Sequence, residues 1–409
     1  MTEGALYVTL FLALYFQTFA LLTFLSRDAR ARRSKQCLAG AFPKVAVVVP
    51  CWNEESTVGG TVESLLALDY PSDKLEIMLI NDGSTDGTRA VMDRYASHPQ
   101  ITVIHKENGG KHSAVNLGIE RTDAAFIGCL DADSFVHRGA LKEVLAHFDD
   151  DRVASVTASM TVHEPRSILE KMQYAEYLAG VALRHILASV NGLYVTPGPF
   201  SFYRRSVIRE LGGFRHGHQT EDMEMAMRLQ RHGYKIENAP RAQVFTKAPR
   251  TIWKLVKQRT RWTSGFIRNA YDYRDLMGNH RYGVLGLIVL PLGVLALVSA
   301  MGLTILTVVD TARMVATALR TQGDVPWSFV FSVPRLDWFY APFTELFALS
   351  LIGIVSVASI MYIGKAISGT QKPIAGDILW YLMCYSFIAP LWVFRSAAYV
   401  ALGVRNAWR

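Results

Sequence analysis

An uncharged run from Ala5 to Leu25 constrains this chain more than any other stretch, because it is long enough to cross a bilayer as a helix. A cleaved signal peptide is the alternative. However, Glu3 precedes the run, no basic segment opens it, and no small-residue cleavage site comes after it. We therefore expect a retained membrane helix within residues 1–26. The arginines and the lysine of the next segment, 27–43, predict that the large middle region of the chain is cytoplasmic.

Three further apolar segments lie toward the other end of the chain, within residues 282–409, at 282–309, 339–363 and 378–402. We expect each to span the membrane, with Pro291 kinking the first and the polar stretch after it lying outside. Glu345 has two interpretations. It is an intramembrane carboxylate that marks a polar pathway, or an interfacial residue if its span begins later.

Composition agrees with a membrane protein that also carries a soluble domain, since half of the 409 residues are hydrophobic. The net charge of +8 does not indicate nucleic-acid binding, because the basic residues gather beside apolar segments and no nucleic-acid motif is present. Anionic lipid headgroups are the expected partner. The four cysteines have no paired spacing, which argues against a disulfide framework and against a zinc site.

The region 44–248 alternates short apolar runs with helical patterns, and the first four runs lie at 45–49, 76–80, 101–104 and 125–130. This alternation predicts an α/β domain with a doubly wound parallel sheet, whose ligands bind at the carboxyl ends of the strands. A helix is expected over 168–188, with its apolar stripe either in the core or on the membrane face. The segment 249–281 carries a basic amphipathic pattern that is typical of a membrane surface.

Two carboxylates, Asp131 and Asp133, come directly after the fourth apolar run with only Ala132 between them. Two hard oxygen ligands at the end of a strand suit Mg²⁺ or Mn²⁺ that bridges a diphosphate. The alternative is that both residues begin a turn or cap the helix near Gly139. The rest of the chain favours the metal interpretation.

Four motifs occur in order, and together they are far more specific than any one alone: Val48-Val49-Pro50-Cys51-Trp52-Asn53-Glu54-Glu55, Asn81-Asp82-Gly83-Ser84-Thr85-Asp86, Asp131-Ala132-Asp133, and Thr220-Glu221-Asp222 followed by Gln258-Arg259-Thr260-Arg261-Trp262. In these motifs the chain resembles the inverting family 2 glycosyltransferases. Within that family it is similar to the membrane-embedded synthases of cellulose, chitin, hyaluronan and poly-N-acetylglucosamine. The resemblance implies a GT-A domain inserted between transmembrane helices, with amphipathic helices at the interface.

The resemblance also implies a binding site for a UDP-sugar, formed by Pro50, Asn53, Glu54, Asp82, Lys111, Asp131 and Arg261. Glu54 and Asp82 would hold the uridine, because carboxylates can accept hydrogen bonds from uracil N3–H or from a ribose hydroxyl. Lys111 would meet the base or the diphosphate, and Arg261 would bind phosphate oxygens through paired hydrogen bonds. Asp131 and Asp133 would hold Mg²⁺ or Mn²⁺. Turn capping is the alternative for Asp82.

The same resemblance implies that Asp222 is the base that takes the proton of the acceptor hydroxyl. The neighbouring Glu221 either raises the pKa of Asp222 by like-charge repulsion or caps the helix. Gln258 and Trp262 would contact the acceptor, although Trp262 without its motif would be interpreted as an interfacial anchor. The loop Thr196-Pro197-Gly198-Pro199-Phe200 stands where such synthases contact the acceptor, so Gly198 and Phe200 are acceptor candidates.

We expect a processive synthase of the inner or plasma membrane that polymerises UDP-N-acetylglucosamine on its cytoplasmic side and passes the β-linked polysaccharide outward. The Asn-Gly-Gly-Lys, Thr-Glu-Asp and Arg-Trp-Thr-Ser-Gly stretches most resemble those of the bacterial poly-N-acetylglucosamine synthases, and this resemblance implies the sugar. The Pro-Gly-Pro loop departs from the cellulose synthase pattern. Two other functions stay open: transfer of one sugar to a lipid, and a catalytically silent partner that binds nucleotide sugar. Since four spans are few for a polymer channel, a small membrane subunit or a homo-oligomer is a further expectation.

Overall fold

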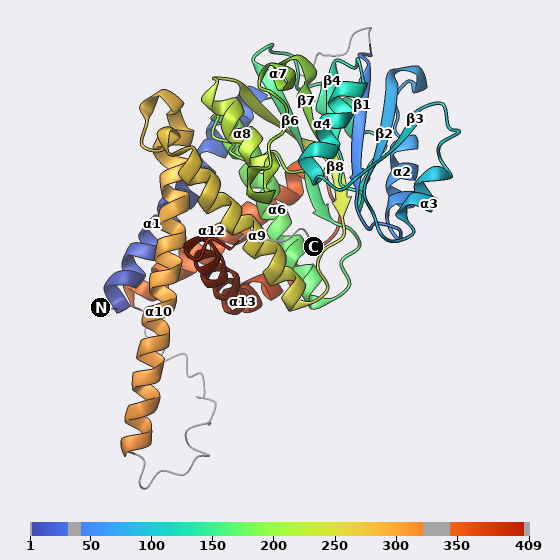
Figure 1. Ribbon diagram of the computed structural model, residues 1–409. Coiled ribbons are helices and arrows are strands. Elements are labelled where there is room, and N and C mark those ends of the chain that lie inside the picture. Colours follow the sequence, from blue (N-terminus) through green and yellow to red (C-terminus); the bar gives the residue numbers. More distant parts are fainter. Residues whose placement is uncertain (1, 32–41, 322–343, 405–409) are drawn as a thin grey trace.

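The computed structural model describes residues 2–31, 42–321 and 344–404 (Figure 1). Most of the basic flank within 27–43, and the polar stretch expected outside the membrane beyond residue 321, lie outside these ranges. The strands are β1 (Val45–Cys51), β2 (Leu75–Asp82), β3 (Ile101–Lys106), β4 (Phe126–Cys129), β5 (Ser134–Val136), β6 (Val153–Val162), β7 (Ser201–Arg204) and β8 (Lys235–Thr246).

The helices that surround the sheet are α2 (Val58–Leu66), α3 (Thr88–Asp93), α4 (Lys111–Arg121), α5 (Ala140–Leu145), α6 (Ile168–Ser189), α7 (Arg205–Glu210), α8 (Glu221–Arg231) and α9 (Ile252–Asp272). Four longer helices complete the described part of the chain: α1 (Thr2–Ala31), α10 (Leu290–Thr321), α12 (Glu345–Ser368) and α13 (Ala375–Ala401). These four are the helices in the described ranges that are long and apolar enough to cross a membrane.

The described strands form one sheet in the order β3-β2-β1-β4-β7-β6-β8-β5. Strands β1 to β4 are mutually parallel, as the alternating sequence pattern predicts, and their carboxyl ends share one edge. Strand β7 runs antiparallel to both β4 and β6, and β5 runs antiparallel to β8. The sheet is therefore mixed, which confirms the α/β domain and adds antiparallel strands that the sequence pattern did not reveal.

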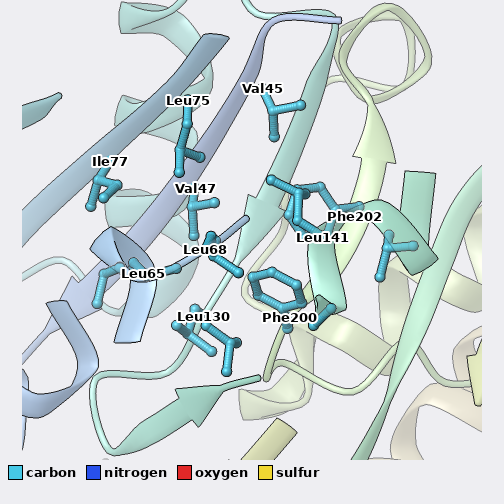
Figure 2. Close-up of a cluster of buried hydrophobic side chains, with 14 of the residues drawn as sticks. Val45, Val47, Leu65, Leu68, Leu75, Ile77, Leu130, Leu141, Phe200 and Phe202 are labelled. Atoms are coloured by element: carbon cyan, nitrogen blue, oxygen red, sulfur yellow. The ribbon is translucent and has the colours of Figure 1, made fainter. Parts of the chain in front are cut away.

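Both faces of the sheet are buried, and β1 shows why its sequence is apolar throughout. Val45, Val47 and Val49 point into a cluster with α2 and α5, part of which Figure 2 shows around Leu65, Leu68 and Leu141. The alternate residues Ala46 and Val48 face α4 and α8 on the other side. A strand with helices on both faces has no solvated side, so each position carries an apolar residue.

Helix α6 joins the sheet to the long helices. It contacts β6 and β8 on one side and α12 and α13 on the other, and its Tyr174 and Leu178 lie in a buried cluster with Met361 and Ile378. Two positions were open for the apolar stripe of this helix, the core and the membrane face. The structure shows the stripe packed within the protein. Helix α9 contacts α13 and α8 (Figure 1), so it lies between the sheet domain and the long helices.

The long helices differ in detail from the segments expected from sequence. The first of the three later spans opens with a π-helical turn, Leu285–Val289, and Pro291 stands directly after that turn at the start of α10. The helix is continuous through this turn, and a local π-helical adjustment is one of the ways a helix accommodates the missing N–H of a proline. Helix α10 also continues past Asp310 to Thr321, with Arg313 near Asp310. Glu345 is the first residue of α12.

Candidate active site

Loops after β1 and β2 meet at the carboxyl edge of the sheet and hold each other in place. Pro50 lies inside β1, opposite Ile80 of β2. Asn53 has a left-handed backbone, with φ 57°, and its side-chain oxygen accepts a hydrogen bond from Thr85 N at 2.8 Å. Its own N–H donates to Ser84 Oγ at 3.1 Å. The first two sequence motifs therefore form a single connected wall.

Glu54 extends this wall. Its backbone N–H donates to Thr88 Oγ1 at 2.7 Å, and its carboxylate accepts a hydrogen bond from Thr57 Oγ1 at 2.6 Å. The backbone carbonyl of Glu54 also accepts from the N–H groups of Thr57 and Val58 as α2 begins. The orientation of this carboxylate is consequently fixed by the helix it precedes.

Asp82 is the most deeply buried carboxylate of the edge, with 2% of its side chain exposed. One oxygen accepts from Lys106 Nζ at 2.5 Å and from Gly109 N at 2.9 Å. Within the described ranges, the other oxygen has no partner. A buried carboxylate oxygen without a partner is costly, so a hydrogen-bond donor that came within reach of this atom would be favoured.

Sequence reasoning missed Lys106, which is the cation that neutralises Asp82. The parallel register of β2 and β3 sets Lys106 directly opposite Asp82. The predicted ligand Lys111 instead donates to Asp131 Oδ1 at 2.5 Å. Burial alone would lower the pKa of Lys111, but the Asp131 carboxylate raises it well above its ordinary value. Lys111 is thus a cation held beside Asp131.

Gly198 brings its loop against this ion pair. A side-chain carbon at Gly198 would lie 2.6 Å from Lys111 Nζ and 3.1 Å from Asp131 Oδ2. Only a residue without a side chain leaves both charged groups in place. The Pro-Gly-Pro loop therefore borders the predicted diphosphate site directly.

Phe200 occupies a different place from the one expected. Its side chain is fully buried in the core beside Phe202 (Figure 2), and its N–H donates to Cys129 O at 2.7 Å. An acceptor cannot reach this ring, so the acceptor contact expected of the Phe200 side chain does not fit its burial. The residue instead fixes the end of the loop to the end of β4.

Hydrogen bonds fix the backbone between Asp131 and Asp133 and the side chain of Asp133. Thr61 Oγ1 of α2 donates to Ala132 O at 2.8 Å, and Ser134 Oγ donates to Asp133 Oδ1 at 3.3 Å. No group of three or more potential metal ligands gathers among the described residues. Two carboxylates nevertheless fit Mg²⁺ or Mn²⁺, which can take their remaining ligands from water and substrate phosphates.

Asp222 lies at the start of α8, next to the buried Glu221. Thr196 donates through both its N–H and its hydroxyl to the backbone carbonyl of Asp222, at 3.4 Å and 2.8 Å. Burial, and next the negative charge of Glu221, raise the pKa of Asp222 from 3.8 to about 6, although Lys111 opposes the shift. A carboxylate with a pKa near 6 accepts a proton more readily than an ordinary one while staying ionised at neutral pH.

Helix α9 carries the last motif and is fixed to the turn that precedes Asp222. Asn269 Nδ2 donates to Thr220 Oγ1 at 2.8 Å, and Gly265 packs so closely on Thr220 that no side-chain carbon would fit there. Gln258 accepts a hydrogen bond from Arg259 at 2.8 Å, and Arg259 also stacks over the ring of Trp262. The motif and the predicted base thus belong to one packed unit.

Arg261, in the same motif, differs from Arg259 in its surroundings. In the part of the chain that the structure describes, no side chain pairs with the Arg261 guanidinium, which is partly exposed. Arg259 is buried and forms an ion pair with Glu176. Of the two arginines, Arg261 is therefore the one whose paired donors are available to an anion.

The described part of the chain is a mixed α/β, GT-A-like sheet that is preceded and followed in the sequence by long apolar helices. The fold resembles the solved structure of a mannosyltransferase from Pyrobaculum calidifontis in complex with GDP-mannose and Mn²⁺. The TM-score is 0.58 at 19% identity, and the match covers 97% of this chain and 99% of that one. At such low identity the likeness shows the fold alone.

The sequence matches a family model, Glycosyltransferase like family 2, over residues 43–265. The chain belongs to this family of glycosyltransferases. It is 28% identical over 265 residues to the poly-beta-1,6-N-acetyl-D-glucosamine synthase of Staphylococcus aureus, covering 64% of each chain. The synthase of the same name from Staphylococcus epidermidis is 31% identical over 224 residues, or 54% of each chain. The chain therefore matches less than two thirds of the length of these relatives.

Proposed function

We propose that this chain polymerises N-acetylglucosamine from a UDP-sugar donor into a β-linked polysaccharide and passes the product across the membrane. The names of the staphylococcal relatives support the choice of sugar and of polymer. The observation that carries the proposal is the placement of Asp222, its pKa raised to about 6, on a helix packed against the motif that contains Arg261 and Trp262. A base, a phosphate-binding cation and an aromatic acceptor contact are the groups that such a transfer requires.

In this proposal the donor lies along the carboxyl edge of β1, β2 and β4. The unpartnered oxygen of Asp82 accepts a hydrogen bond from the uracil or the ribose, and Glu54, Asn53 and Pro50 form the wall beside it. The diphosphate lies toward Lys111 and Arg261, whose charges balance the charge that develops on the leaving UDP.

Transfer then requires proton removal by Asp222 from the acceptor hydroxyl. As the proton leaves, the hydroxyl oxygen attacks the anomeric carbon from the face opposite the diphosphate. The new glycosidic bond forms while the bond to UDP breaks, so the configuration at that carbon inverts. Gln258 and Trp262 hold the acceptor sugar in position for this attack, the indole against the apolar face of the ring.

Asp131 and Asp133 would hold Mg²⁺ or Mn²⁺, which when bound supplies positive charge against the diphosphate. The neighbour from Pyrobaculum calidifontis was solved with Mn²⁺, which supports this assignment. Lys111 donates to Asp131 Oδ1, so the Asp131 carboxylate would be shared between this lysine and an ion at the site.

We further propose that the catalytic domain, residues 44–248, faces the cytoplasm, with segment 249–281 at the membrane surface and the helices of 1–26 and 282–409 as spans. Anionic lipids would meet the basic flank at 27–43. Since the four spans within the described ranges are few for a polymer channel, a homo-oligomer or a small membrane subunit would complete it.

The decisive experiment incubates the purified protein in nanodiscs with a panel of radiolabelled UDP-sugars and either Mg²⁺ or Mn²⁺, and separates the products by size. High-molecular-weight product from UDP-N-acetylglucosamine alone, sensitive to a matching glycosidase, is the expected result. A product that stops at one sugar on a lipid would contradict processive synthesis. Absence of turnover with every donor would favour a silent partner protein.

A further inference from the structure

A carboxylate on α6, Glu176, joins three helices: α6, α9 and α13. Its Oε2 accepts a hydrogen bond from Arg259 Nη2 of α9 at 2.7 Å, and its Oε1 accepts one from the Tyr385 hydroxyl of α13 at 3.2 Å. Glu176 is 21% exposed and Arg259 only 4%, so the pair is largely removed from water. None of the sequence motifs includes Glu176.

Arg259, the partner of Glu176, contacts both residues that are proposed to bind the acceptor. Arg259 Nη1 donates to Gln258 Oε1 at 2.8 Å, and the guanidinium lies 4.2 Å from the centre of the Trp262 ring. Arg259 and Trp262 are three residues apart on α9 and so share one face of the helix. A planar guanidinium that is fixed at one end by a carboxylate fixes the plane of the ring on which it stacks.

Stability alone does not account for such a pair. Withdrawing two charges from water costs free energy that their mutual attraction only partly returns, and apolar residues of similar size often replace them without loss. What an ion pair supplies that apolar packing does not is a defined direction for each of its members. Here one member joins three helices, and the other orients Gln258 and Trp262.

We propose that Glu176 is a positioning residue for the acceptor: through Arg259 it sets the orientation of Gln258 and Trp262, and through Tyr385 it ties them to α13. This inference rests on the proposed function. It concerns the acceptor and leaves the donor site unaffected, since Glu176 makes no contact with Asp82, Lys111 or Asp131 among the described interactions.

The test is the variant Glu176→Gln in nanodiscs, with UDP-N-acetylglucosamine as donor and a short β-1,6-linked N-acetylglucosamine oligosaccharide as acceptor. The KM for the oligosaccharide should rise about 10- to 100-fold, because Gln258 and Trp262 would contact the acceptor in a poorer geometry, and each tenfold corresponds to about 1.4 kcal/mol. Affinity for UDP, measured by calorimetry, should stay within about twofold of wild type. Arg259→Lys should raise the same KM, because lysine keeps the charge but not the planar stack.

The matched control is Glu170→Gln on the same helix. Glu170 is also buried and also pairs with an arginine, Arg250 at 3.0 Å, but it caps the start of α6 and contacts no residue of the α9 motif. It should lower thermal stability and leave the KM for the acceptor unchanged. An unchanged KM in Glu176→Gln, or a loss of UDP affinity equal to the rise in KM, would overturn the positioning role.

Failure of the proposed function would be distinguishable from failure of this inference. If the wild type transfers no sugar to the oligosaccharide, the function is wrong, and hydrogen exchange of α9 then decides the structural claim. Faster exchange over residues 258–262 in Glu176→Gln than in Glu170→Gln would support the anchoring of the motif. Equal exchange in the two variants would refute it.

Discussion

Replacing Asp222 by Asn tests the assignment of the base through both rate and stability. The variant keeps the size of the side chain and removes its ability to take a proton, so transfer should fall about 10²- to 10⁴-fold. UDP should still bind with wild-type affinity, because Asp82 and Lys111 are untouched. In the wild type the rate should rise with pH through about 6, where Asp222 ionises, and then level off.

The stability effect of the same variant has a definite sign. The pKa of Asp222 lies near 6 in the folded chain and at 3.8 ordinarily, so between these values the folded state binds more protons than the unfolded state. Stability should therefore fall as pH rises from about 4 to about 6. Two pKa units correspond to at most about 3 kcal/mol. Asp222→Asn should accordingly raise the melting temperature at pH 7.5 and have little effect near pH 4.

The neighbouring carboxylate provides a second variant for the same argument. Because the charge of Glu221 helps to raise the pKa of Asp222, Glu221→Gln should shift the acidic limb of the pH–rate profile to lower pH. Loss of UDP binding in Asp222→Asn, or an acidic limb that persists unchanged in Glu221→Gln, would refute this assignment of the base.

Three further outcomes are expected. Gly198→Ala should reduce transfer about tenfold or more without unfolding the protein, since the added carbon displaces Lys111. A normal rate in this variant would exclude a tight approach of the loop to Lys111. Lys106→Gln should weaken UDP binding by calorimetry, because the buried Asp82 loses its cation, whereas unchanged affinity would place the nucleotide elsewhere. Chelation of divalent metal should abolish transfer until Mg²⁺ or Mn²⁺ is restored, and full activity in chelator would exclude the metal role.

The parallel half of the sheet was predictable from sequence, because each of its strands is a short apolar run that ends at a turn. Strands β5, β7 and β8, in the other half, were not. Strand β8 contains Pro240, which falls where its pairing with β6 shifts register between Ala158 and Ser159. A proline inside a strand argues against a strand unless a bulge accommodates it, and a bulge depends on the partner strand. Local pattern alone therefore could not identify β8.

A similar limit applies to the candidate site. Asp82 and Asp222 could be proposed from the sequence, because the residues next to them along the chain complete a recognisable motif. Lys106 could not, since its role depends on its register opposite Asp82. Phe200 was assigned to the acceptor because of its place in the chain, whereas its left-handed backbone, with φ 62°, turns its ring into the core. Such effects depend on contacts between distant segments.

Helix α9 connects the region of the predicted base to the long apolar helices. In its later half, Asn269 donates a hydrogen bond to Thr220. The backbone carbonyl of Thr260 accepts a hydrogen bond from Ser396 of α13. Arg268 donates one to the carbonyl of Tyr399, also on α13. A helix transmits a displacement along its length because its backbone bonds resist bending. A shift of α13 would therefore reach Gln258 and Trp262 and, through Asn269 and Thr220, the turn that precedes Asp222. Under the proposed function, the acceptor contacts and the base are thus both connected to α13 through one helix.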